Sequence, residues 1–230
     1  DALKAYLMLG DHQRRDLDWF LSWLGQSPIP EVKFASEANI QRHMEALFDR
    51  DPEFELGNLD DTTIARTRKI LTRASGSEAV YSRIKQMYEG ESTDLLPEMG
   101  PYFTGVFETR SESGLLVPTL FTVAGYQTVD FSIKSDAVLA WLDDRWVLGE
   151  EGVPNPLEVS RVAGGVRPLY AHDYISTWQG LIGGIDLIVP TDKDVMLDTL
   201  GYLSDPTMSP MSSLARLVAT ETTLPEQDNS

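Results

Sequence analysis

The chain of 230 residues contains no cysteine. Disulfide bonds, thiolate metal ligands and cysteine nucleophiles are therefore excluded, although a cysteine-free chain is compatible with both reducing and oxidising compartments. Basic residues are also scarce, because 19 Lys and Arg stand against 36 Asp and Glu and give a formal net charge of -17. Such a charge repels phosphate backbones and anionic lipid headgroups, so nucleic acid is not expected as a partner.

Long apolar runs are missing as well. A membrane-spanning helix requires about 18 or more apolar residues in succession, and a signal peptide needs a shorter apolar core near its start. Neither pattern is present. The hydrophobic share of 42%, with five Trp, eight Tyr and eight Phe, indicates a packed protein rather than a disordered one. We expect a soluble segment, part of a longer protein, that does not itself span a membrane.

Motifs that carry chemistry are absent too. The sequence has no GxxxxGK[ST] phosphate loop, no GxSxG nucleophile elbow and no HExxH zinc helix. His12 and His172 adjoin aspartates, but neighbours in sequence do not face each other on a helix, so we interpret both as structural. His43 is predicted to lie on a solvated face.

Carboxylates are so abundant that adjacent pairs arise from composition alone. The segment 192–194 resembles the start of a calcium loop, but Leu197 occupies the position where that loop needs glycine. We therefore predict no catalytic, cofactor-binding or metal-ligating residues, and no cofactor.

Apolar residues recur at intervals of three and four over most of the chain, which predicts amphipathic helices. Leu17, Phe20 and Leu24 form one such face. Asp60, Ser77 and Ser209 begin others, where their short oxygen-bearing side chains can cap the first free amides. The predicted helices lie at 11–25, 40–48, 60–71, 77–88, 129–142, 170–185, 197–203 and 209–218.

Between about 89 and 116 the helical period fails, while Gly, Pro, Ser and acidic residues accumulate. This composition predicts a long irregular connection, with one short β-hairpin formed by 102–107 and 115–117. We expect a mainly α fold of the multi-helix bundle type. Its expected parts are an N-terminal helical subdomain at 1–90, an irregular connection at 91–121 and a C-terminal helical subdomain at 122–230.

Several motifs follow one another in a specific order. Residues 117–126 read VPTLFTVAGY, and WVLG follows at 146–149. Other ordered segments are LKAYLML at 3–9, a YxxxYxxxW stripe at 170–178, SPM at 209–211 and ET at 221–222. Together they resemble the IcmF-related family, the TssM proteins of bacterial type VI secretion systems. Thr119 departs from the pattern, because the family has glycine in its VPGLFT segment.

The motif residues are of types that build structure. Pro118 holds its predecessor in extended geometry, and Thr122 can cap a following helix. The aromatic stripe is predicted to pack into a core, with a groove for a partner helix as the alternative. The family-marker residues, all predicted to be structural, are Pro118, Phe121, Thr122, Gly125, Tyr126, Trp146, Gly149, Tyr170, Tyr174 and Trp178.

The resemblance implies the helical, periplasmic part of an inner-membrane scaffold in a Gram-negative bacterium. Its implied partners are a TssJ-like outer-membrane lipoprotein, a TssL-like inner-membrane protein and other TssM copies. The expected function is protein–protein contact within a membrane complex, and not catalysis. Two alternatives stay open. One is a periplasmic carboxylate-based cell-wall hydrolase, which needs two facing acids. The other is a regulatory domain that binds a soluble partner without joining the complex.

Overall fold

The computed structural model describes residues 1–26, 37–72, 75–112, 114–150 and 152–226. Within these residues the regular structure consists of eleven α-helices, four short 3-10 helices and two two-stranded antiparallel sheets. The prediction of a mainly α fold is therefore confirmed. Contacts divide the chain into two compact units, one made of Asp1–Ala74 with Leu142–Val153 and the other of Ser75–Trp141 with Pro154–Ser230. The three segments expected from composition remain a prediction.

The first unit is helical throughout its regular structure. Its elements are α1 (Ala2–Gly10), η1 (His12–Arg14), α2 (Leu17–Gln26), α3 (Glu37–Arg50), α4 (Asp61–Leu71) and η4 (Arg145–Leu148). Met8, Phe20 and Phe48 form the centre of its core. Asp60 caps α4 as predicted, because its carboxylate accepts the N–H groups of Thr62 and Thr63.

The helix predicted at 11–25 begins later than expected. Its first part forms the separate turn η1, in which the Asp11 side chain accepts the N–H of Gln13. The N–H groups at the start of α2 then find another carboxylate, because Asp16 accepts the N–H of Trp19 at 2.9 Å. Two local caps thus divide the segment 11–25, which the apolar spacing predicted to be one helix.

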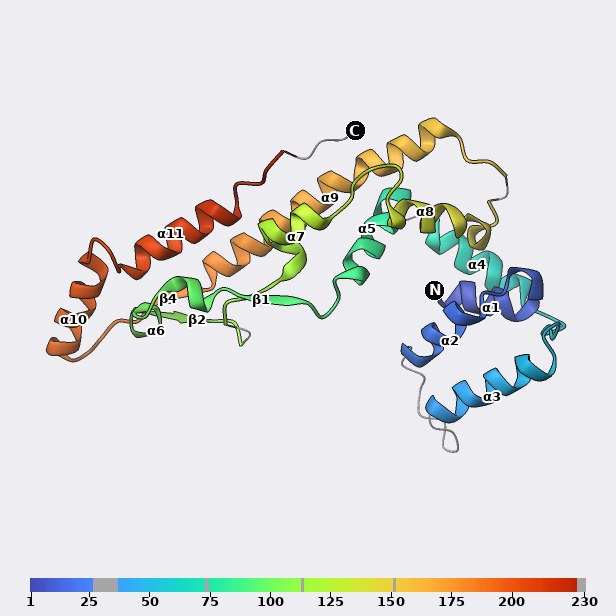
Figure 1. The fold of residues 1–230 in the computed structure, drawn as a ribbon, viewed down its shortest axis with the longest axis horizontal. Coiled ribbons are helices and arrows are strands. Elements are labelled where there is room, and N and C mark those ends of the chain that lie inside the picture. Colours follow the sequence, from blue (N-terminus) through green and yellow to red (C-terminus); the bar gives the residue numbers. More distant parts are fainter. Residues whose placement is uncertain (27–36, 73–74, 113, 151, 227–230) are drawn as a thin grey trace. The chain divides into compact units, whose positions relative to one another are not determined.

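The second unit is built around one long helix (Figure 1). Its elements are α5 (Gly76–Met87), β1 (Ser92–Asp94), η2 (Leu96–Met99), α6 (Phe103–Val106), β2 (Phe107–Thr109), β3 (Leu116–Pro118), η3 (Thr119–Phe121), α7 (Val123–Thr128), α8 (Asp136–Asp143), α9 (Pro156–Gly183), β4 (Ile185–Leu187), α10 (Lys193–Ser204) and α11 (Pro210–Glu221). The last residues of α8 extend into the first unit.

The expected hairpin is wrong. Residues 107–109 and 116–118 are strands, but each pairs elsewhere: β2 is antiparallel to β4, and β3 is antiparallel to β1. Residues 103–106 form the short helix α6 instead of a strand. Pairing partners far along the chain cannot be recognised from turn signals between neighbours, which is why the local pattern misled.

Two predicted helix boundaries are also corrected. The helix expected at 129–142 is two helices, because α7 ends at Thr128 and α8 begins only at Asp136. The helix expected at 170–185 begins at Pro156 and continues through Pro168 as α9. It ends at Gly183, after which 185–187 form β4.

Two caps differ from their predictions. Ser75, not Ser77, caps α5, since Ser75 and Glu78 exchange side-chain to backbone hydrogen bonds in a capping box. Ser77 lies inside α5 and donates to the Val162 carbonyl of α9 at 2.8 Å. The Ser209 hydroxyl donates to the Leu203 carbonyl at 2.9 Å instead of capping α11.

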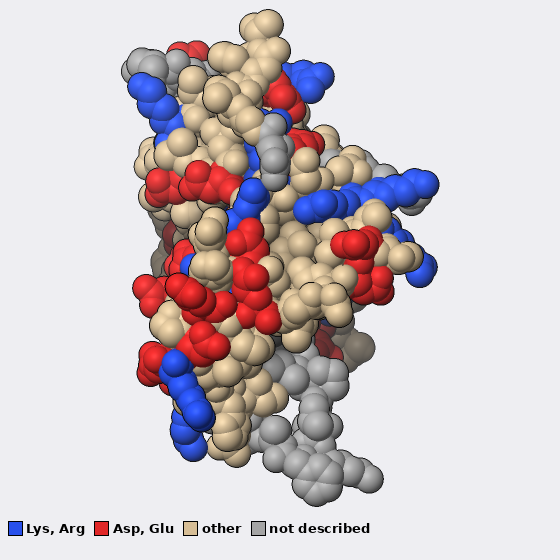
Figure 2. All heavy atoms as spheres, turned by 90° about the vertical axis from the view of Figure 1, so that its right-hand side faces the viewer, with Lys and Arg blue, Asp and Glu red and all other residues tan. Residues whose placement is uncertain are grey.

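Charge is dispersed on the face drawn in Figure 2, where Asp and Glu side chains lie among Lys and Arg side chains and uncharged surface. The acidic excess therefore forms no unbroken patch on that face. Among the described residues no helix combines the length and the apolar character that crossing a membrane would require.

Candidate functional site

The motif at 117–126 forms a tight turn between β3 and α7. Val117 is buried at the end of β3, and η3 follows directly. The Thr122 hydroxyl donates to the Thr119 carbonyl at 2.8 Å and accepts the N–H of Gly125 at 3.0 Å. The predicted capping role of Thr122 is confirmed, and one side chain joins the end of η3 to the start of α7.

Gly125 lies where no side chain fits. A Cβ atom at this position would lie 2.0 Å from the Thr119 carbonyl oxygen and 3.0 Å from the Leu120 Cα. Both neighbours are backbone atoms, which cannot rotate away as the end of a side chain can. The glycine therefore allows α7 to approach η3 closely.

The aromatic stripe of α9 packs against this turn. Tyr170, Tyr174 and Trp178 expose only 1%, 3% and 2% of their surfaces, so core packing is confirmed and a stripe open to a partner helix is wrong. Tyr170 packs against Phe121 and Tyr126, with ring centroids 5.9 and 5.7 Å away.

The polar atoms of the stripe donate to main-chain carbonyls. Tyr170 donates its hydroxyl to the Leu120 carbonyl at 2.7 Å, and the Trp178 indole N–H donates to the Phe121 carbonyl at 2.9 Å. A buried hydroxyl or indole N–H needs such a partner. The stripe thus fixes the position of η3 by hydrogen bonds as well as by packing.

Glu221 closes the cluster at the end of α11. Its carbonyl accepts the Tyr174 hydroxyl at 2.5 Å, while its carboxylate accepts the N–H of Val123 at 2.7 Å. This carboxylate satisfies a free amide in the first turn of α7. Glu221 was absent from the predicted site residues, although the ET motif at 221–222 was the signal that could have identified it.

Burial keeps the tyrosines protonated. It raises the pKa of Tyr170 and Tyr174 well above the usual range, and for Tyr174 the negative charge of Glu221 adds to the effect. Burial likewise raises the pKa of Tyr81, whose hydroxyl donates to the Asp173 carboxylate at 2.9 Å. These hydroxyl groups therefore act as donors at neutral pH.

The WVLG residues belong to the first unit. Arg68 of α4 donates to the carbonyls of Val147 at 2.8 Å and Trp146 at 3.4 Å. Gly149 has a φ of 81°, a left-handed conformation that favours glycine, and ends η4. Trp146 also lies under the Arg14 guanidinium, 5.1 Å from it. Trp146 and Gly149 thus belong to a different unit from the aromatic cluster, and sequence reasoning missed Arg68.

The histidines have ordinary surroundings. His12 pairs through Nδ1 with the Glu55 carboxylate at 2.6 Å, and not with its neighbour Asp11. The hydrogen bonds from His12 lower the pKa of Glu55. His43 and His172 are exposed. No group of three or more potential metal ligands occurs among the described residues.

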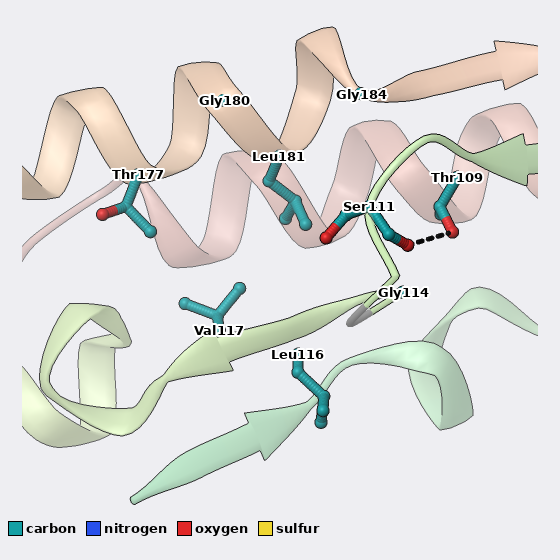
Figure 3. A pocket seen from close by; sticks show the side chains of 9 residues that line it. All are labelled: Thr109, Ser111, Gly114, Leu116, Val117, Thr177, Gly180, Leu181 and Gly184. Carbon is teal, nitrogen blue, oxygen red and sulfur yellow. Dashed lines mark hydrogen bonds between the residues drawn. The ribbon is translucent and has the colours of Figure 1, made fainter. Parts of the chain in front are cut away.

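Two small hollows lie in the second unit. The one in Figure 3, of about 160 Å³, is lined by hydroxyl, glycine and aliphatic residues, with Val117 on one side and Thr177 and Leu181 of α9 on the other. Another, of about 150 Å³, has Asp130 and Asp136 in its wall, and the Asp130 carboxylate accepts the N–H of Ser132. Both are smaller than the usual small-molecule site of about 300–1,000 Å³.

Comparisons with known proteins agree with the motif order. A family model described as IcmF-related, intracellular multiplication and human macrophage-killing, matches residues 1–223. The chain is 28% identical over 240 residues to the type VI secretion system component TssM1 of Pseudomonas aeruginosa. That match covers 99% of this chain but only 21% of the relative, so the chain spans about a fifth of the relative's length. No solved structure matches significantly. The chain therefore belongs to the IcmF-related family.

Proposed function

We propose that this chain is a structural module of the membrane complex of a type VI secretion system. It would be the periplasmic part of a TssM-like inner-membrane scaffold and would act by contact with TssJ-like, TssL-like and other TssM-like proteins. The name of the Pseudomonas aeruginosa relative supports the system, and the family match extends over nearly the whole chain.

One observation carries the structural role. Motif residues from three distant segments meet in one cluster. Tyr170 and Trp178 donate hydrogen bonds to η3 carbonyls, and the Glu221 carboxylate accepts an N–H of α7. Each of these groups bonds to the main chain. Such residues hold the backbone in place, so contact with a partner protein is left to exposed residues.

The pKa shifts in this structure give no support to the hydrolase alternative. A general acid of a glycosidase requires a carboxyl group with a raised pKa. Among the described residues, accepted hydrogen bonds lower the pKa of four carboxyl groups, which is the opposite of what a general acid needs. These groups are Glu55, Asp60, Asp186 and Asp205.

The test uses the full-length parent protein in its own bacterium. An in-frame deletion of these 230 residues should abolish both assembly of the membrane complex and secretion of its effectors. Assembly is measured by co-purification of the TssJ-like and TssL-like proteins and by native gel electrophoresis. Normal secretion after the deletion would sink the proposal.

Point variants separate contact from loss of folding. Substitutions of exposed polar residues that keep the far-UV circular dichroism should include some that block assembly, whereas His172→Ala serves as an exposed control expected to be silent. Cross-linking with mass spectrometry, through the lysines of the segment, then identifies the partners in the assembled complex. Cross-links only to a soluble protein outside the complex would instead favour the regulatory domain.

A further inference from the structure

A groove of about 470 Å³ runs beside the N-terminal half of α9 in the second unit. It is formed by the segment between α7 and α8 on one side and by α9 on the other. Its volume falls in the range of sites that hold a small ligand or a few residues of a peptide. The lining residues are Phe131, Ser132, Ile133, Lys134, Ser160, Ala163, Gly164 and Arg167.

The groove is cationic in a strongly acidic chain. Lys134 and Arg167 contribute positive charges, and none of the described residues that line the groove is Asp or Glu. The Arg167 guanidinium lies 5.1 Å from the centre of the Phe131 ring, a cation–π contact that holds it in place. Lys134 is exposed, and its ammonium group has no partner among the described residues. Two positive charges in the lining favour an anionic group, and a carboxylate is the anion that the side chains of a protein segment supply.

At Gly164 the groove is lined by main chain without a side chain. Glycine weakens the interior of a helix, and a Cβ atom at this position would meet nothing within 4 Å. Its neighbour Gly165 is different, because a Cβ atom there would lie 2.3 Å from the Ser77 hydroxyl oxygen of α5. The packing of the described chain explains Gly165 and leaves Gly164 unexplained.

Pro168 adds a hydrogen-bond acceptor at the same place. Proline has no N–H, so it cannot donate to the carbonyl four residues earlier in the helix. That carbonyl belongs to Gly164, inside α9. The groove thus combines space for a close backbone approach with a carbonyl that lacks its usual helical donor.

We propose that this groove binds an extended segment of a partner protein that carries an Asp or Glu side chain. The carboxylate meets the Lys134 ammonium group, with the Arg167 guanidinium also in the lining, while the backbone crosses α9 at Gly164 and can donate an N–H to its carbonyl. Ile133, which is 48% exposed, and Phe131 receive an adjacent apolar side chain. The inference goes beyond the proposed assembly role, because it specifies the chemistry of a partner and holds whichever complex that partner belongs to.

An acidic peptide fits better than an anionic membrane. The site is a groove rather than a plane, and a bare glycine serves close approach of a backbone, which a lipid headgroup does not need. The net charge of the chain also opposes approach to a large anionic surface, whereas a single carboxylate enters only the local field of the two cations.

The test selects displayed random eight-residue peptides against the 230-residue chain, and then measures synthetic copies by fluorescence anisotropy. Selected peptides should carry Asp or Glu. Lys134→Glu should weaken their binding about tenfold or more, because charge reversal opposes the carboxylate. Gly164→Leu should have an effect of similar size because its side chain fills the groove. Gly201→Leu is the matched control: Gly201 lies in α10, away from the groove lining, with open space around its Cβ position, and binding should change less than about twofold.

Gly164→Ala guards against misfolding of the leucine variant. Alanine strengthens a helix, so this variant should unfold at a higher temperature and yet bind the peptides more weakly. If Gly164 served only the fold, Gly164→Ala would not raise the unfolding temperature and weaken peptide binding at the same time. The proposal is overturned if the selected peptides lack carboxylates or if Lys134→Glu and Gly164→Ala leave their affinity unchanged. It is equally overturned if the chain binds vesicles containing phosphatidylglycerol but no peptide.

Discussion

Replacing Gly125 by alanine tests the close approach of α7 to η3. Helix propensity alone predicts a gain, because alanine is favoured over glycine in a helix by about 1 kcal/mol. The geometry predicts the reverse. The new methyl carbon would lie 2.0 Å from the Thr119 carbonyl oxygen, and reaching an ordinary separation of 3.4 Å requires a shift of 3.4 minus 2.0, or 1.4 Å. The obstacle is backbone, so α7 or η3 must move.

The cost can be set from two contributions. Overpacking a tightly packed site costs about 1–3 kcal/mol, and movement of α7 also weakens the Thr122 to Gly125 hydrogen bond, which contributes about 0.5–1.5 kcal/mol. The gain in propensity offsets up to about 1 kcal/mol of this. We expect the free energy of unfolding of Gly125→Ala to fall by about 0.5–4.5 kcal/mol.

The assay is urea unfolding followed by far-UV circular dichroism and tryptophan fluorescence, with comparison of m-values to check that the same surface is exposed. Gly180→Ala is the matched control, because Gly180 lies in α9 and a Cβ atom there meets nothing within 4 Å. It should be stabilised by about 0.5–1 kcal/mol. A Gly125→Ala variant as stable as Gly180→Ala would refute the geometric reasoning.

Two further predictions follow from the hydrogen bonds. Burial raises the pKa of Tyr170, so above about pH 10 a tyrosine in the unfolded chain loses its proton while Tyr170 in the folded chain keeps it. The free energy of unfolding should therefore fall as pH rises through that region, which urea unfolding between about pH 8 and 11 measures. Tyr170→Phe should reduce this slope. At neutral pH the same variant should cost about 1–2 kcal/mol, because the Leu120 carbonyl is left unpaired. Arg68→Ala should cost about 1–3 kcal/mol, because the Val147 carbonyl loses its Arg68 donor and the Trp146 carbonyl keeps only the Gly149 N–H, and an unchanged urea midpoint would contradict this assignment.

Much of the helical structure could be predicted from the sequence, because apolar spacing reports the buried face directly. Asp60 and Thr122 were recognisable as caps for the same reason, since a short oxygen-bearing side chain beside free amides is a local pattern. The pairing of strands that lie far apart in the sequence could not be predicted. β2 pairs with β4 across about 80 positions of sequence, and nothing in 107–109 indicates that partner.

Pro168 shows a different limit. Proline usually ends a helix, so a helix starting at 170 was a reasonable expectation, yet α9 runs through it. The packing of α9 against α5, with Ser77 bonded to the Val162 carbonyl and Gly165 beside it, supplies stabilisation that local propensity does not include. Tertiary contacts overrode a local signal here.

The residue types of the candidate site could be predicted from the sequence, but their hydrogen-bond partners could not. The sequence pattern placed the tyrosines and the tryptophan of α9 on one face, but it could not show that Tyr170 and Trp178 donate to the consecutive carbonyls of Leu120 and Phe121. Phenylalanine at both positions would keep an aromatic ring there but leave two buried carbonyls without these donors. Tyrosine and tryptophan are therefore explained by the acceptors of η3, which tie the turn between β3 and α7 to α9.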